Sequence, residues 1–242
     1  MDHIYILNVV FDFGYGEETI YPVILKDKDE MILVDCGYSS FLTKLEEAAY
    51  EKGIDFSKLT KVIITHHDHD HMGSLAEIKR KYPNIQVIAS EKDAPFISGK
   101  LKSLRLEQAE IMQSKLPLVQ QESGKLFQEI LKSVENEEVD LTVKDGDCFP
   151  WCGEIEIVET PGHMPGHISI YIKKHKALIS GDALAIENGK LEIAAPQFTL
   201  DMNEAKESVS KLLNYDIETV ICYHGGEYKG DVSESLKKIL EG

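Results

Sequence analysis

One segment, residues 65–71, constrains this chain more than any other. It holds four histidines and two aspartates, follows a β-branched run at residues 62–64 and precedes an amphipathic helical pattern. So many imidazoles and carboxylates would build a poor core or turn, whereas imidazole suits zinc, copper, iron and nickel. The sequence therefore predicts a transition-metal site at a strand-to-helix turn. The alternative is a solvated histidine-rich loop that binds metal only incidentally.

Three later segments each place one more candidate ligand directly after a strand-like run. These ligands are His163, Asp182 and His224. Each has glycines beside it, which let the backbone turn tightly. Four strand ends can therefore converge on one site.

This pattern resembles the metallo-β-lactamase superfamily of metallohydrolases, whose first motif is Thr-His-x-His-x-Asp-His. The gapless match spans residues 65–71 and puts Asp68 where the family has its second histidine. His67 and His69 then fall on variable positions, with His69 as the substitute for Asp68 if the turn is remodelled. The similarity runs from Asp35, in the family's hydrophobic-Asp-x-Gly element, to His224.

The resemblance implies a dinuclear centre that binds two divalent metal ions, with zinc expected and iron or manganese as alternatives. Its seven ligands would be His66, Asp68 and His163 for metal one, Asp70, His71 and His224 for metal two, and Asp182 as the bridge. A metal-bridging hydroxide would be the nucleophile. Asp70 would also be catalytic, because it could orient the nucleophile and pass a proton to the leaving group.

Asp68 changes the charge of such a centre. Three carboxylates and a hydroxide would cancel two divalent cations, whereas a histidine at position 68 would leave one positive charge. We therefore expect weaker attraction of anionic substrates, a less acidic bound water and greater tolerance for iron or manganese.

Other polar residues near the motifs have simpler expected roles. Asp35 is expected to orient a ligand by hydrogen bonding, or else to form the turn before Gly37. His167 is expected to hydrogen-bond the backbone rather than to bind metal. Tyr223 and Met164 either line the pocket or pack in the core.

Alternating strand-like and helical patterns indicate an α/β or α+β protein, and the resemblance narrows this to an α+β, four-layer αββα sandwich. Residues 1–242 are expected to form a single domain that opens with a hairpin turning at residues 13–16. Residues 93–137 are expected to be a helical insertion broken at Ser123-Gly124. The insertion either packs on the domain body or caps the metals; in this family such insertions often shape the pocket or a dimer contact. Ser39 or Ser40 is expected to cap the helix that follows Gly37.

The amino-acid composition limits the kinds of molecule that the chain is expected to bind. The formal net charge of -16 argues against a nucleic-acid surface, because phosphate backbones are bound mainly through lysine and arginine. No apolar run reaches the length of a membrane span, and residues 1–7 lack the pattern of a secretory signal. Four scattered cysteines fit a reduced, cytoplasmic protein. A small-molecule substrate is therefore expected, with no nucleic acid and no membrane, and a homodimer is left open.

The leading hypothesis is a dinuclear metal-dependent hydrolase of a small ester, thioester, lactone or phosphoester. One alternative is an iron-dependent oxidoreductase on the same fold, since the related diiron flavoproteins have a carboxylate at the position of Asp68. That branch uses glutamate there and carries a flavin domain for which this chain has no room. The other alternative is a non-catalytic metal-binding module, which the open metal positions disfavour.

Overall fold

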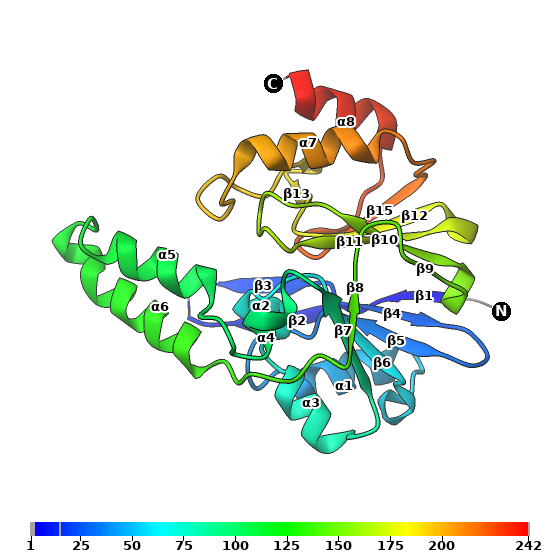
Figure 1. The fold of residues 1–242 in the computed structure, drawn as a ribbon, viewed down its shortest axis with the longest axis horizontal. Helices are drawn as coiled ribbons and strands as arrows, with labels where there is room; N and C mark the ends of the chain where they lie inside the picture. Colours follow the sequence, from blue (N-terminus) through cyan, green and yellow to red (C-terminus); the bar gives the residue numbers. More distant parts are fainter. Residues whose placement is uncertain (1–2, 15, 242) are drawn as a thin grey trace.

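Two six-stranded sheets face each other in the computed structural model, which describes residues 3–14 and 16–241 (Figure 1). The first sheet has the strand order β1-β4-β5-β6-β7-β8. Its strands are His3–Ile6 (β1), Val23–Lys26 (β4), Met31–Val34 (β5), Lys61–Ile64 (β6), Gln86–Ser90 (β7) and Leu141–Val143 (β8). The strands from β5 to β8 are parallel neighbours, so the chain returns through helices between them.

The second sheet has the order β16-β15-β12-β11-β10-β9. Its strands are Gly226–Glu227 (β16), Thr219–Cys222 (β15), Ala177–Gly181 (β12), Ile168–Ile172 (β11), Ile155–Glu159 (β10) and Cys148–Phe149 (β9). Two hairpins stand apart: Val9–Asp12 (β2) pairs with Glu17–Ile20 (β3), and Ala185–Glu187 (β13) pairs with Lys190–Glu192 (β14). The expected opening turn includes Tyr15, which lies outside the described residues.

Helices cover the outer face of each sheet (Figure 1). Leu42–Glu51 (α1) and Leu75–Lys81 (α3) bury their apolar faces in one core cluster with the first sheet. Met202–Leu212 (α7) and Val232–Glu241 (α8) do the same on the second sheet. Short 3-10 turns lie at Phe56–Lys58 (η1), Trp151–Gly153 (η3) and Lys173–His175 (η4).

A third core lies between the sheets and is built largely from β-branched residues of both. Ile63, Ile88, Ile157 and Ile170 are fully buried there. Branched side chains pack well on a pleated surface, and their removal from water stabilises the sandwich by about 25 cal/mol per Å² of apolar surface. The expected four-layer αββα architecture is confirmed.

The insertion contains Ala94–Ile97 (α4), Leu104–Gln113 (α5), Leu118–Gln120 (η2) and Gln121–Ser133 (α6). In Figure 1, α5 and α6 form a hairpin that projects from the body of the molecule, and we call residues 104–133 the arm. That residues 1–242 form one domain, with an insertion at 93–137, stays a prediction. Among the described residues, no helix is long and apolar enough to cross a membrane.

Two local expectations are wrong. The helix α6 runs through Ser123-Gly124, and the break lies before it. A Cβ at Gly124 would lie 2.4 Å from Leu116 Cδ1, so this glycine permits close packing rather than ending a helix. Neither Ser39 nor Ser40 caps helix α1; instead the backbone N–H of Phe41, at the start of α1, donates to the Oγ of the distant Ser74 at 2.8 Å.

Candidate metal centre

The predicted ligands meet at one end of the two sheets. The loop after β6 and the short helix His69–Met72 (α2) carry four of them, His66, Asp68, Asp70 and His71. The second sheet carries the others, since His163 lies between β10 and β11, Asp182 follows β12 and His224 follows β15. Strand ends of both sheets thus supply one cluster, as the sequence predicts.

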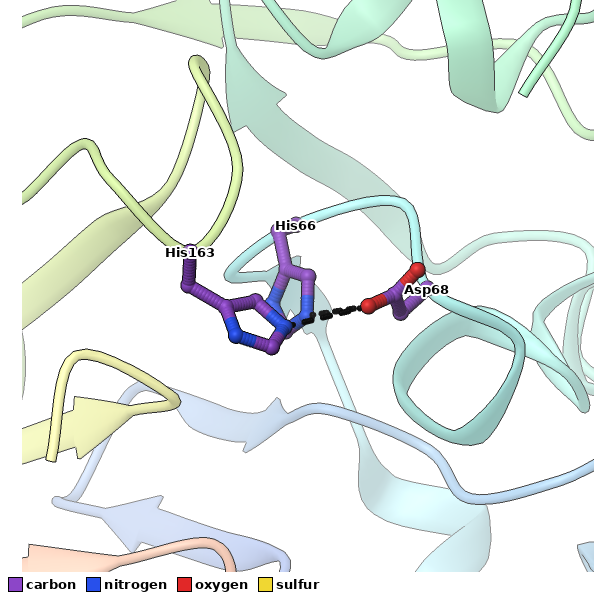
Figure 2. Close-up of side chains that lie close together, drawn as sticks. All are labelled: His66, Asp68 and His163. Carbon is purple, nitrogen blue, oxygen red and sulfur yellow. Dashed lines mark hydrogen bonds and ion pairs between the residues drawn. The ribbon is translucent and has the colours of Figure 1, made fainter. Parts of the chain in front are cut away.

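The first group joins His66, Asp68 and His163. Figure 2 shows their side chains pointing toward one another from two separate loops. The Nε2 of His163 lies 3.1 Å from Asp68 Oδ2, and the Nε2 of His66 lies 3.4 Å from the same oxygen. One ligand atom from each residue fits within 4.8 Å of the other two, which suits a single cation.

The second group joins Asp70, His71 and His224, again within 4.8 Å. The Nε2 of His224 lies 3.2 Å from Asp70 Oδ2. Asp182 stands between the groups: one carboxylate oxygen lies 3.4 Å from His71 Nε2 and the other 3.6 Å from His163 Nε2. A third group, His66, His71 and Asp182, also lies within 4.8 Å, so Asp182 stands between the first two groups. The assignment of these seven residues as metal ligands stays a prediction.

Orphaned polar atoms test whether the cluster fits metal. Within the part of the chain that the structure describes, His66 Nε2, His71 Nε2 and Asp182 Oδ1 are buried without a hydrogen bond. Burying such atoms without a partner is costly, and protein interiors avoid it. These atoms face one another, so divalent cations would satisfy all three. The residues of the cluster therefore fit a pair of divalent metal ions.

Asp35 holds one ligand in orientation, as expected. Its Oδ2 lies 2.9 Å from His71 Nδ1 and accepts from Thr65 Oγ1 at 2.8 Å, while Oδ1 accepts from the Thr65 N–H. A φ of 59° at Asp35 turns the chain sharply after β5, a conformation that aspartate tolerates better than most residues. A proton on His71 Nδ1 leaves Nε2 free for a cation.

The remaining histidines of the motif have other partners. The Nδ1 of His67 lies 2.8 Å from Asp93 Oδ2, away from the cluster. His69 packs edge-on against Tyr38 and Phe127, with ring centroids 5.3 Å and 5.5 Å away, so Asp68 and not His69 lies with the first group.

His167 bonds the backbone, as expected. Its Nε2 accepts from the N–H of Asp182 at 2.9 Å. A Cβ at Gly181 would lie 2.6 Å from that nitrogen, and the φ there is +52°, so glycine permits this close approach. Met164 and Tyr223 are buried, and the Tyr223 hydroxyl donates to the Asp70 carbonyl.

Arg105, at the start of α5, is the residue that the sequence did not reveal. Its Nε donates to Asp68 Oδ1 at 3.1 Å and its Nη2 to Asp68 Oδ2 at 2.6 Å. Both side chains are nearly inaccessible, with 5% and 6% exposed. One signal was available: a buried carboxylate needs a counter-charge, and the chain has only two arginines, Arg80 and Arg105.

Neighbouring groups fix the charges of the first group. Burial raises the pKa of Asp68, but the hydrogen bond with His163, the nearby imidazole of His66 and the charge of Arg105 lower that pKa well below its ordinary value. Burial, followed by the charge of His71, lowers the pKa of His66. A neutral imidazole and an ionised carboxylate are the forms that bind metal.

A pocket of about 460 Å³ opens above the cluster. The arm and the loop before α7 supply aromatic walls through Phe127 and Phe198, and Tyr38 lines it from the body. Polar groups at the base of an apolar cleft of this size are typical of a small-molecule site.

Comparison with known proteins agrees with this geometry. The profile of the family described as "Metallo-beta-lactamase superfamily" matches residues 15–224. The chain belongs to the metallo-β-lactamase superfamily. The expected family is thus confirmed, and with it the expectation that the chain is a metallohydrolase.

Two curated relatives show how far the similarity extends. The chain is 26% identical to "Probable metallo-hydrolase YflN" of Bacillus subtilis (strain 168) over 227 residues, or 86% of this chain and 82% of that protein. It is 25% identical to a hydroxyacylglutathione hydrolase of Rhizobium meliloti (strain 1021), covering 71% of this chain but only 49% of that enzyme. A metallo-beta-lactamase family protein from Thermus thermophilus has the same fold, with a TM-score of 0.76 at 19% identity over 98% of this chain and 78% of that one.

Proposed function

We propose that this chain is a dinuclear hydrolase of a small ester or thioester, with zinc as its metal. The observation that carries the proposal is the pair of adjacent His and Asp groups, with Asp182 between them, at the base of the pocket. Thioesters come first among the substrates because hydroxyacylglutathione hydrolases are among the relatives. Lactones and phosphoesters remain in the substrate panel.

Each residue of the cluster would have a distinct role. His66, Asp68 and His163 would hold one cation, Asp70, His71 and His224 the other, and Asp182 would touch both. When bound, the two cations would lower the pKa of a shared water and polarise the substrate's carbonyl or phosphoryl oxygen. The walls formed by Phe127 and Phe198 would exclude bulk water from the acyl group.

Asp70 would transfer the proton of the attacking water to the leaving group. Burial raises its pKa, but the charge of His71 and the hydrogen bond from His224 lower it well below the ordinary value. Asp70 is therefore ionised at neutral pH, and its carboxylate can take a proton from the water as that water attacks. After attack it can hand the proton to the leaving alkoxide or thiolate.

The test combines metal analysis with a substrate panel. Protein grown in defined medium with zinc, iron or manganese is analysed for bound metal and assayed on esters, thioesters, lactones and phosphodiesters. We expect two zinc ions per chain and hydrolysis of an ester or thioester. Asp70→Asn should lower kcat by about a hundredfold or more, because it removes both the general base and one carboxylate of the second group. Asp216→Asn, on a side chain that is 73% exposed, is the control.

Two outcomes would overturn this proposal. One is full metal loading without hydrolysis of any member of the panel. The other is bound iron together with peroxide or persulfide turnover, which would instead support the oxidoreductase alternative.

A further inference from the structure

The arm reaches the metal centre through Arg105, whose guanidinium is fixed from several sides. Besides its two-point contact with Asp68, its Nη2 donates to the carbonyl oxygen of Phe198 at 2.8 Å. Its Nη1 donates to Gln108 Oε1, one turn further along α5, at 2.6 Å. A planar guanidinium with this many fixed donors has little freedom to leave the carboxylate.

The preceding residues of motif and arm are joined as well. The N–H of Leu104 donates to His67 Nε2 at 3.3 Å. His67 is itself held by Asp93 and by the ring of Phe96, stacked at 4.4 Å. Two successive motif residues, His67 and Asp68, therefore hold two successive residues of α5. The start of the arm is docked on the motif loop rather than merely lying near it.

The contact between Arg105 and Asp68 also changes the net charge beside the first group. A histidine at position 68 would bring no charge, whereas Asp68 brings one negative charge close to the other carboxylates of the cluster. Arg105 cancels that charge in a buried setting, where an unpaired ion would be costly. The sequence-based expectation that Asp68 makes the centre neutral did not include Arg105. The arginine adds one positive charge beside the first group.

We propose that Asp68 and Arg105 act as one neutral unit at the first metal position, so that Arg105 sets the charge of the metal centre through Asp68. Asp68 then supplies an oxygen toward His66 and His163 while the arginine keeps the local charge equal to that of a histidine. The proposal rests on the proposed function only in that the cluster binds two cations. Its test therefore measures metal affinity and needs no hydrolysis.

A series of variants separates charge from mere packing. Asp68→His leaves Arg105 unpaired and should weaken one of the two stepwise zinc affinities at least about tenfold, because a buried positive charge then lies beside the cation. The double variant Asp68→His with Arg105→Gln lacks that charge, and its zinc affinity should return to within about threefold of wild type. Arg105→Gln alone leaves the carboxylate uncompensated and should bind zinc at least as tightly as wild type. The other stepwise affinity should change little in all of these variants.

Two controls make the outcome specific. Asp68→His with Arg105→Lys keeps a positive charge and should stay weak. Lys102→Gln removes an exposed positive charge just before the arm, where Lys102 pairs with Glu110, and should leave both affinities within twofold. Zinc affinities come from competition with a chromophoric chelator, and thermal unfolding of each variant checks that it is folded.

Several results would overturn the proposal. If Arg105→Gln fails to restore the Asp68→His protein, or by itself weakens zinc binding tenfold, the arginine only shapes the loop. The single variant Arg105→Gln decides the question even if Asp68→His does not fold. If the zinc affinities change as expected but no substrate is hydrolysed, the proposed function fails and this inference stands. If a substrate is hydrolysed but the affinities do not change as expected, this inference fails and the proposed function stands.

Discussion

Asp35 lies outside the three groups of expected ligands but orients one of their members, His71. Its carboxylate lies 2.9 Å from His71 Nδ1 and is held by two hydrogen bonds from Thr65. Without that acceptor, the proton of a neutral imidazole could sit on either nitrogen. With it, the lone pair of Nε2 is directed toward the cluster.

Asp35→Asn should therefore weaken zinc binding by about 10- to 100-fold, the usual effect of removing a residue that orients a ligand. The amide removes the charge and can present an N–H to His71, which favours the wrong tautomer. Chelator competition measures the effect, and Asp29→Asn, on a side chain that is 71% exposed, is the control. An affinity equal to wild type would show that His71 keeps its orientation without Asp35.

At this scale, the sequence located the cluster because the ligand spacing is local. Residues 65–71 and the three later strand ends carry their chemistry within a few positions of a recognisable element. The contact between Asp68 and Arg105 spans 37 residues and depends on the direction in which α5 leaves the body. No local pattern encodes that direction, so Arg105 was missed.

At the scale of elements, single side chains join strands to the helices that cover them. Asp140, just before β8, accepts from the backbone N–H of Val87 in β7 and from Lys79 Nζ in α3, both at 2.8 Å. Burial raises the pKa of Asp140, but the bonds from Lys79 and Val87 lower it below its ordinary value of 3.8.

Asp140→Asn should lower the free energy of unfolding at pH 7 by about 1 kcal/mol, the net value of one such hydrogen-bonded contact. Because the native pKa is lowered, the wild-type advantage is present above the unfolded pKa and disappears as the pH falls below about 4 through the native pKa. Urea unfolding of both proteins at pH 7 and at steps below pH 4 measures this. A difference that stays constant with pH would contradict the assignment.

Helix ends were the weakest sequence expectations. Ser39 and Ser40 precede a helix, but the N–H of Phe41 bonds to Ser74 instead, from a distant turn. Ser123-Gly124 has the composition of a break, yet Gly124 provides room for Leu116 inside the hairpin of the arm. In both cases a tertiary contact decided what local preference could not.

At the scale of the whole molecule, the layer between the sheets sets the position of the cluster. The expected ligands that follow β6 come from one sheet, and those that follow β10, β12 and β15 come from the other. Packing of the inner faces therefore determines how the two sets of ligands meet. The layered fold was predictable because its strands are strongly apolar and its motifs follow a known order, whereas the projection of the arm was not.

Ile170→Ala should destabilise the fold by about 2–5 kcal/mol, since Ile170 is fully buried between the sheets and its truncation leaves a cavity. Ile111→Ala, on the arm with 64% exposure, should change stability by less than about 0.5 kcal/mol. Urea unfolding midpoints compare the two. Equal losses would mean that the arm is as tightly packed as the inner layer.

The docking of Leu104 and Arg105 on the motif loop also suggests where chimeras of such proteins should be joined. A graft that retains these two residues and exchanges the helical hairpin after them would replace Phe127, and with it part of the pocket wall, while preserving the ionic anchor. Substrate preference could then be diversified as a module, separately from the chemistry of the cations.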